Sequence, residues 1–211
     1  MNRKDEVADE NREKNYRPLT FVDQLEKNRH IVLLYDDQKY AFRIIARYFL
    51  NGLTNGESCI FFTSDNPDEI EKRLNKEGID VRFYKNNNLL RIYTIERSDE
   101  NKHETLNTLR HIRKDATVGM KPPFRFAGRT ITNTETMEGM KLGIVLEEVG
   151  HKNFDSFDNS QLCFYDISKI EKSMRPKWIQ NLLKAHHCVI YASEPSKAVA
   201  FDTNLLEDQE V

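Results

Sequence analysis

The sequence predicts an α/β fold with three layers, in which a mostly parallel central sheet carries helices on both faces. Two patterns predict it. Short apolar runs of strand length alternate along the chain with longer segments whose apolar residues recur at helical spacing. The clearest example runs from His30 to Val81, where strand, helix, strand and helix patterns follow one another. Such alternation is typical of parallel strands joined by crossover helices.

The stretch from His30 to Val81 contains the best-defined elements. Ile31–Tyr35 and Cys59–Phe62 are apolar runs that predict buried strands. Between them lies an amphipathic helix, whose apolar positions are Ala41, Ile44, Ile45, Tyr48, Phe49 and Leu53. Asn66 and Pro67 predict the N-cap and the first turn of the next helix, and Gly78 its end.

The remaining elements continue the alternation. A short helix is expected over Phe21–Leu25. Arg82–Tyr84 is interpreted as a strand end, and a helix is expected to start at Thr132, with Glu135 completing a capping box. Another helix is expected over 101–116, and a last one begins at Pro176. Further strands are expected at Leu89–Ile95, Phe124–Ala127, Leu162–Tyr165, Cys188–Ala192 and, as an edge strand, Ala198–Phe201.

The chain is expected to form one folded domain between two charged tails. Its 211 residues suffice for one domain with a substantial core. Residues 1–19 mix both charge signs with few apolar groups, which predicts a disordered tail. The folded domain is assigned to residues 20–203, and residues 204–211 form an acidic C-terminal tail.

Composition argues against several classes of protein. The formal net charge of −2 provides no global positive field, so direct binding of nucleic acid is not expected. No apolar run approaches the roughly 20 residues of a membrane helix, and the N-terminus lacks the apolar core of a signal peptide. The three cysteines are widely spaced within apolar runs, which favours buried thiols in a reducing cytoplasm.

The turn after the first strand argues against nucleotide hydrolysis. A phosphate-binding loop needs glycines, whose backbone N–H groups converge on the anion, and a lysine. Here the turn reads Tyr35-Asp36-Asp37-Gln38-Lys39, which has two carboxylates and no glycine. No phosphate-loop motif occurs elsewhere among the eight glycines. No catalytic residue, cofactor or metal ligand is therefore assigned.

Four motifs carry a resemblance to a known family. They are H-I-V-L-L-Y-D-D at 30–37, F-L-N-G-L-T-N-G-E at 49–57, L-C-F-Y-D-I-S at 162–168 and L-L-K-A-H-H-C-V-I at 182–190. In combination they resemble the MEDS domain, the methanogen/methylotroph DcmR-type sensory domain, over residues 30 to 203. This resemblance implies a RecA/KaiC-like fold without a phosphate loop. It also implies an archaeal-type sensory domain that recognises a small organic ligand in signal transduction or transcription regulation.

The predicted ligand site lies in the crevice at the carboxyl ends of the strands, the usual ligand position in open α/β sheets. An arginine follows the glycine at 128, where the family pattern suggests an acidic residue, and this favours an anionic group on the ligand. The nine candidate ligand-binding residues are His30, Tyr35, Asp36, Asp37, Arg129, Cys163, Tyr165, Asp166 and His186.

Several of these residues have a structural alternative. Asp36 and Asp37 serve equally well as helix caps, and His30 as a partner of neighbouring backbone. The run His186-His187-Cys188 lacks the spacing of a zinc motif. A nucleophilic pair of Cys163 and His186 would indicate a third class of protein, a hydrolase.

The sequence therefore predicts a non-catalytic, cytoplasmic sensory or regulatory domain. Its expected partners are a small organic ligand and either a second copy of the chain or a signalling protein. The alternative is a degenerate ATPase-like scaffold that acts only through protein–protein contact.

Overall fold

The computed structural model describes residues 17–95, 102–128, 135–156, 158–170, 172–173 and 175–204. Its strands form one sheet with the order β3-β2-β4-β5-β1-β6-β7. The strand bounds are β1 His30–Tyr35, β2 Ser58–Thr63, β3 Leu90–Thr94, β4 Phe124–Gly128, β5 Asn159–Asp166, β6 Cys188–Ala192 and β7 Val199–Asp202. All neighbours pair in parallel except β6 and β7, which are antiparallel. The predicted fold class is confirmed.

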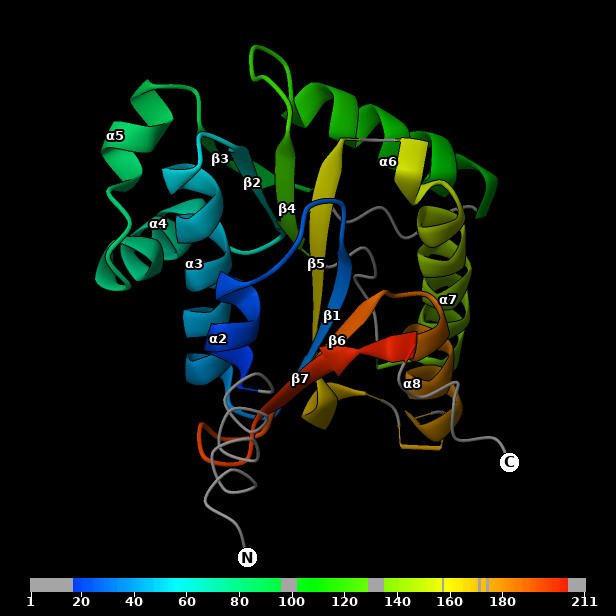
Figure 1. Cartoon of the computed structure of the whole chain (residues 1–211). Coiled ribbons are helices and arrows are strands. Elements are labelled where there is room, and N and C mark those ends of the chain that lie inside the picture. Colours follow the sequence, from blue (N-terminus) through cyan, green and yellow to red (C-terminus); the bar gives the residue numbers. More distant parts are fainter. Residues whose placement is uncertain are drawn as a thin grey trace, which may run out of the picture.

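Helices cover both faces of the sheet (Figure 1). Their bounds are α2 Pro18–Asp23, α3 Gln38–Thr54, α4 Pro67–Lys76, α5 Val81–Asn86, α6 Lys102–Ala116, α7 Met137–Lys152 and α8 Arg175–Lys184. In Figure 1, α2, α3 and α4 lie on one side of the sheet, and α7 and α8 lie on the other. The sheet is thus the middle of three layers.

Each face of the sheet has its own core because successive side chains of a strand point to opposite faces. Ile31, Leu33 and Leu162 belong to the larger core beneath α3. Val32 and Cys163 belong to the smaller core beneath α7 and α8, which also holds Trp178. We call these two sides the α3 face and the α7 face.

Several local predictions are confirmed. Asn66 caps α4, accepting a hydrogen bond from Asp68 N at 2.9 Å, with Pro67 in the first turn. Gly78, just beyond that helix, has a φ of +94°, a conformation that side chains disfavour. The strand expected at Ala198–Phe201 is the edge strand β7, and the three cysteines are buried free thiols.

Two local predictions are wrong, and the boundary of a third differs. The segment Arg82–Tyr84 lies within helix α5 and is not a strand end, because the Asp80 side chain caps a helical turn by accepting from Phe83 N at 3.0 Å. Helix α7 starts at Met137, with Thr136 as its N-cap. The capping box expected from Thr132 to Glu135 therefore does not define this helix, and Thr132 itself lies outside the described residues. The predicted N-terminal tail overlaps the start of α2, whose Pro18 is buried.

Candidate functional site: a buried polar cluster on the α7 face

Strand alternation brings polar side chains together on the α7 face. His30 shares this face of β1 with Val32, and Gln161 shares the same face of β5 with Cys163 and Tyr165. The register pairs His30 with Gln161 and Val32 with Cys163, so the polar side chains of the two strands are neighbours. Glu147 reaches them from α7, and His186 comes from the short connection between α8 and β6.

Four of these side chains meet at one point, and we call them the buried polar cluster: His30, Glu147, Cys163 and His186. One ligand-type atom from each lies within 4.8 Å of the others. Glu147 Oε2 is 3.5 Å from His30 Nε2, 3.6 Å from His186 Nε2 and 3.7 Å from Cys163 Sγ. Cys163 Sγ is also 3.5 Å from His30 Nε2. None of the four residues is more than 2% exposed.

A ring of hydrogen bonds orients the cluster from outside. The Tyr165 hydroxyl donates to Glu147 Oε1, which leaves Oε2 directed at the two imidazoles. Gln161 Nε2 donates to Cys163 Sγ at 3.0 Å, and the Gln161 carbonyl oxygen accepts from Arg113. His186 Nδ1 lies 2.7 Å from the Leu182 carbonyl oxygen. Because a carbonyl oxygen can only accept, Nδ1 carries the proton and Nε2 presents a lone pair.

Four of the six histidines gather around this point. The His30 ring stacks on the His186 ring with centroids 3.9 Å apart, and on Phe154 with centroids 5.0 Å apart. His151 and His187, both half-buried, lie beside them with ring centroids 4.7 Å apart. The His30 backbone N–H donates to His187 Nδ1 at 3.0 Å, so the structural role considered for His30 involves its backbone and leaves its ring free for the cluster.

Burial sets the protonation of the cluster. It lowers the pKa of His186 to about 3 and, aided by repulsion from His186 and His151, holds the pKa of His30 well below its usual value. Burial raises the pKa of Glu147 to about 7, although the hydrogen bonds from Tyr165 and Cys163 and the charge of Arg113 oppose this shift. Near neutral pH, the two imidazoles are neutral and the carboxyl group lies close to its midpoint.

The cluster is not internally satisfied. Within the described part of the chain, no group lies within hydrogen-bonding reach of His186 Nε2 or His30 Nδ1, and both atoms are inaccessible to solvent. A buried polar atom without a partner costs about 1–3 kcal/mol. Unpaired buried groups of this kind are uncommon in folded proteins and call for an explanation, such as an ion or a ligand.

The other predicted site residues lie at the carboxyl ends of the strands. Asp37 is the N-cap of α3 and accepts from Lys39 N and Tyr40 N at 2.9 and 3.0 Å. Asp36 accepts from the Tyr191 hydroxyl at 3.0 Å, and Asp166 accepts from Ser168 N at 3.0 Å. Tyr35 packs into the core of the α3 face. Arg129 lies outside the described residues.

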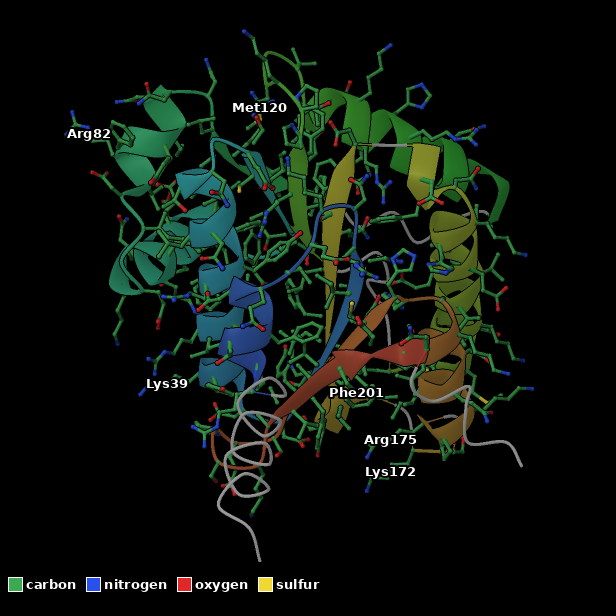
Figure 2. All side chains as sticks on the ribbon, viewed as in Figure 1. Lys39, Arg82, Met120, Lys172, Arg175 and Phe201 are labelled. Carbon is green, nitrogen blue, oxygen red and sulfur yellow. The ribbon has the colours of Figure 1, made fainter. Side chains whose placement is uncertain are left out.

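The nine predicted residues therefore separate into two groups. Figure 2 shows Met120, which precedes β4, and Lys39, which follows β1, at opposite ends of the molecule. Tyr35, Asp36, Asp37 and Asp166 belong to the carboxyl end, near Lys39. His30, Cys163 and His186 join inside the molecule together with Tyr165, which is 1% exposed and directed at Glu147.

Sequence reasoning missed Glu147, Gln161 and Arg113. Glu147 was detectable because it lies three residues after Ile144 and seven after Met140, on the apolar face of its helix. Gln161 was detectable because it alternates with Cys163 and Tyr165 on one strand face. Arg113 left no comparable signal, because its contact with Gln161 joins residues 48 positions apart.

The arrangement offers two imidazole nitrogens, one carboxylate oxygen and one sulfur around a single point. Such a set can bind a transition-metal ion, or it can bind a small polar molecule through hydrogen bonds. No helix in the described part of the chain has the length and apolar character needed to cross a bilayer.

Comparison with known proteins gives a family match and matches of fold. Residues 29–196 match the family described as MEDS, the MEthanogen/methylotroph, DcmR Sensory domain. A search of curated proteins gave no match. Among solved structures, the chain is similar to a KaiC-like protein from the hyperthermophilic archaeon Pyrococcus horikoshii OT3, with a TM-score of 0.53 and 14% identity. The alignment covers 79% of this chain and 72% of that one, and it shows a shared fold.

Proposed function

Because this chain belongs to the MEDS family of sensory domains, we propose that it is a non-catalytic domain that binds a small ligand and regulates signal transduction or transcription. The observation that carries this proposal is the buried polar cluster. Polar atoms without partners are placed in an otherwise apolar core, where they cost stability unless something binds them. We place the sensing centre at this cluster and the domain in the cytoplasm, where its three thiols stay reduced.

The turn between β1 and α3 supports a role without nucleotide hydrolysis. The Asp37 side chain occupies the N-terminus of α3, where related folds bind phosphate through backbone N–H groups. It accepts two of those N–H groups itself, and its charge opposes a triphosphate. The chain thus keeps a KaiC-like fold, but the turn between β1 and α3 lacks the groups that bind a phosphate.

The burial of the cluster supports a role without nucleophilic catalysis. A Cys163–histidine pair exists in space, with His30 Nε2 at 3.5 Å from Sγ, and so resembles the hydrolase alternative. However, Cys163 is fully buried and its sulfur already receives the Gln161 amide. A substrate carbonyl needs access to the sulfur and a set of oxyanion donors, and the cluster supplies ligand atoms instead.

A thermal-shift panel tests this proposal. The full chain is screened against small alcohols, amines, thiols and carboxylic acids, both with and without added metal ions. A ligand at one hundred times its Kd stabilises the folded state by about 2.7 kcal/mol, which is readily measured as a rise in Tm. Tyr165→Phe removes the hydroxyl that orients Glu147 and should reduce the response, whereas Asp36→Asn at the carboxyl end should retain it.

The response of these two variants decides where the sensing centre lies. A response that is lost in Asp36→Asn and kept in Tyr165→Phe would move the sensing centre to the carboxyl ends of the strands. A panel without any stabilising compound, under either metal condition, would contradict small-ligand sensing altogether.

The scaffold alternative is favoured by one observation. Met137 and Val145, spaced for one side of α7, are 48% and 50% exposed although both are large and apolar. They lie on the helix that contributes Glu147 to the cluster. A scaffold would bind a second copy or a signalling protein through this side without any ligand. Gel filtration and pull-down with Val145→Glu test this: ligand-independent association that the substitution abolishes supports the scaffold.

A further inference from the structure

The geometry points to a metal site: we propose that the buried polar cluster binds one divalent transition-metal ion, for which Zn²⁺ is the natural probe. The four ligands are His30 Nε2, Glu147 Oε2, Cys163 Sγ and His186 Nε2. This inference builds on the proposed function by naming the chemical class of the ligand. Four separate observations support it.

The distances fit a tetrahedron. Zinc binds nitrogen and oxygen at about 2.0–2.1 Å and sulfur at about 2.3 Å, so neighbouring ligand atoms in a tetrahedral site lie about 3.3–3.6 Å apart. The four separations known here are 3.5, 3.5, 3.6 and 3.7 Å. Four of the six separations therefore already lie within a few tenths of an ångström of tetrahedral values, and all six are within 4.8 Å.

The two nitrogen–oxygen distances in this set are too long for good hydrogen bonds between the imidazoles and Glu147. Hydrogen bonds from N–H to oxygen have heavy-atom separations of about 2.7–3.2 Å. Both imidazoles instead approach one carboxylate oxygen of Glu147 at 3.5 and 3.6 Å. A core that used these groups only for internal hydrogen bonding would pair them closely. It would not leave His186 Nε2 buried without a partner among the described residues.

The surrounding hydrogen bonds prepare the ligands. Metal-binding histidines normally donate their other ring N–H to a carbonyl or carboxylate, which fixes the tautomer and the ring orientation. The Nδ1 of His186 does this with the Leu182 carbonyl oxygen. Tyr165 restrains the second oxygen of Glu147, and Gln161 donates to Cys163 Sγ, a bond that favours the thiolate required of a ligand.

The composition of the donor set selects the class of metal. Two neutral imidazoles, one carboxylate and one thiolate would balance a charge of +2, with Arg113 nearby through Gln161. Imidazole and thiolate are poor ligands for Mg²⁺ and Ca²⁺, which prefer oxygen, and good ligands for zinc and its neighbours. All four ligands come from the protein, which is typical of a closed site that holds an ion rather than an active one.

The site would join four separate parts of the fold. His30 begins β1, Cys163 lies within β5, Glu147 belongs to α7 and His186 precedes β6. Glu147 is the one ligand of the cluster that α7 contributes. Loss of the ion would therefore break the link that Glu147 makes between α7 and the sheet. Metal occupancy thus controls how firmly α7 is held, which provides a physical route from binding to a regulatory output.

Metal titration of the full chain tests the site. Protein dialysed against a chelator is titrated with Zn²⁺ in competition with a chromophoric chelator, and with Co²⁺ followed by absorption spectroscopy. We expect one ion per chain, a visible spectrum of tetrahedral Co²⁺ and a thiolate-to-cobalt charge-transfer band in the near ultraviolet. X-ray absorption of the zinc-loaded wild type should show one sulfur and three nitrogen or oxygen ligands.

Matched variants locate the ion. Cys163→Ser should abolish the charge-transfer band, and His186→Gln should weaken Zn²⁺ binding at least tenfold. Cys59→Ser removes a buried thiol on the α3 face and should change neither. Absence of stoichiometric Zn²⁺ binding, or a first shell without sulfur in the wild type, would overturn the metal site. So would a charge-transfer band that persists in Cys163→Ser. The wild-type X-ray absorption result decides even if a variant does not fold.

Failure of this inference and failure of the proposed function are distinguishable. Organic ligands that stabilise the metal-free chain, without zinc binding, would retain the sensory proposal and eliminate the metal. Zinc binding without any response to the organic panel would retain the metal as the sensed species.

Discussion

The two faces of the sheet each bury a constellation of charged or titratable side chains, and the two differ in completeness. On the α3 face, Arg125 Nε and Nη2 donate to the carboxylate of Glu57 at 2.5 and 3.2 Å, and Nη1 donates to the Tyr48 carbonyl oxygen at 2.9 Å. Arg125 and Glu57 are 4% and 5% exposed. The pair is bidentate and fully engaged, as buried ion pairs must be to offset their desolvation.

The buried polar cluster on the α7 face is the opposite case. Between its own members, the closest contacts from nitrogen to oxygen are 3.5 and 3.6 Å, and it includes an imidazole nitrogen without a partner in the described chain. Both constellations are buried, so burial alone does not separate structure from function. Hydrogen-bond satisfaction separates them better: a network that is complete in itself stabilises the fold, and one that is incomplete leaves a buried polar atom that needs a further partner.

The largest expected effect comes from breaking the complete pair. Glu57→Ala leaves Arg125 buried with an unbalanced charge, and breaking such a pair costs about 3–5 kcal/mol. Denaturant unfolding should show this loss in the free energy of unfolding. The double variant Glu57→Leu with Arg125→Met removes both charges and should recover most of it. A loss below about 1 kcal/mol in Glu57→Ala would mean that the two constellations do not differ as described.

The next effect is the pH dependence of the incomplete cluster in metal-free protein. The pKa of Glu147 is about 7 in the folded chain against an ordinary value of 4.5. The folded state binds the proton of the Glu147 carboxyl group more tightly than the unfolded state does. The contribution of this proton to the free energy of unfolding is therefore complete below pH 4.5 and is lost as the pH rises through about 7. The shift corresponds to about 3 kcal/mol.

Glu147→Gln provides the matched measurement. The variant cannot ionise at this position, so its free energy of unfolding should lack this dependence between about pH 5 and pH 8. It should also exceed that of the metal-free wild type at the alkaline end. Identical pH profiles for the two proteins would show that Glu147 ionises without cost, which would remove the electrostatic distinction between the two faces.

The sequence predicted the fold far better than the site. Alternating apolar runs depend on local pattern, so the order of strands and helices, apart from α5, and the cap at Asn66 could be predicted directly. The cluster depends on strand order, which brings β1 between β5 and β6 and joins residues more than 130 positions apart. Three of its four members, His30, Cys163 and His186, were named as site residues, but they were grouped with aspartates that lie at the carboxyl ends of the strands.

The role of the carboxylates at the carboxyl end of the sheet is what the sequence could not decide. A carboxylate after a strand can bind a ligand or cap the following helix, and sequence alone weighs the two equally. Asp37 caps, with both of its hydrogen bonds directed at the start of α3. The prediction of a strand end at Arg82–Tyr84 was wrong for a related reason. The Asp80 side chain caps this short segment of mixed apolar and polar residues, which forms a helix.

The smallest predicted effect tests that assignment of Asp37. Asp37→Ala should lower the free energy of unfolding by about 1 kcal/mol, the usual value of an N-cap, and Asp37→Ser should retain most of it because serine also caps. Neither substitution should change zinc affinity or the ligand response, because Asp37 lies on the α3 side of the carboxyl end, away from the cluster. Equilibrium unfolding and the metal titration measure the two quantities on the same preparations. If Asp37→Ala weakened ligand or metal binding while Asp37→Ser preserved stability, the carboxylate would belong to a site after all. The contrast between the complete Arg125–Glu57 pair and the incomplete cluster on the α7 face would then have to include the carboxyl end of the sheet.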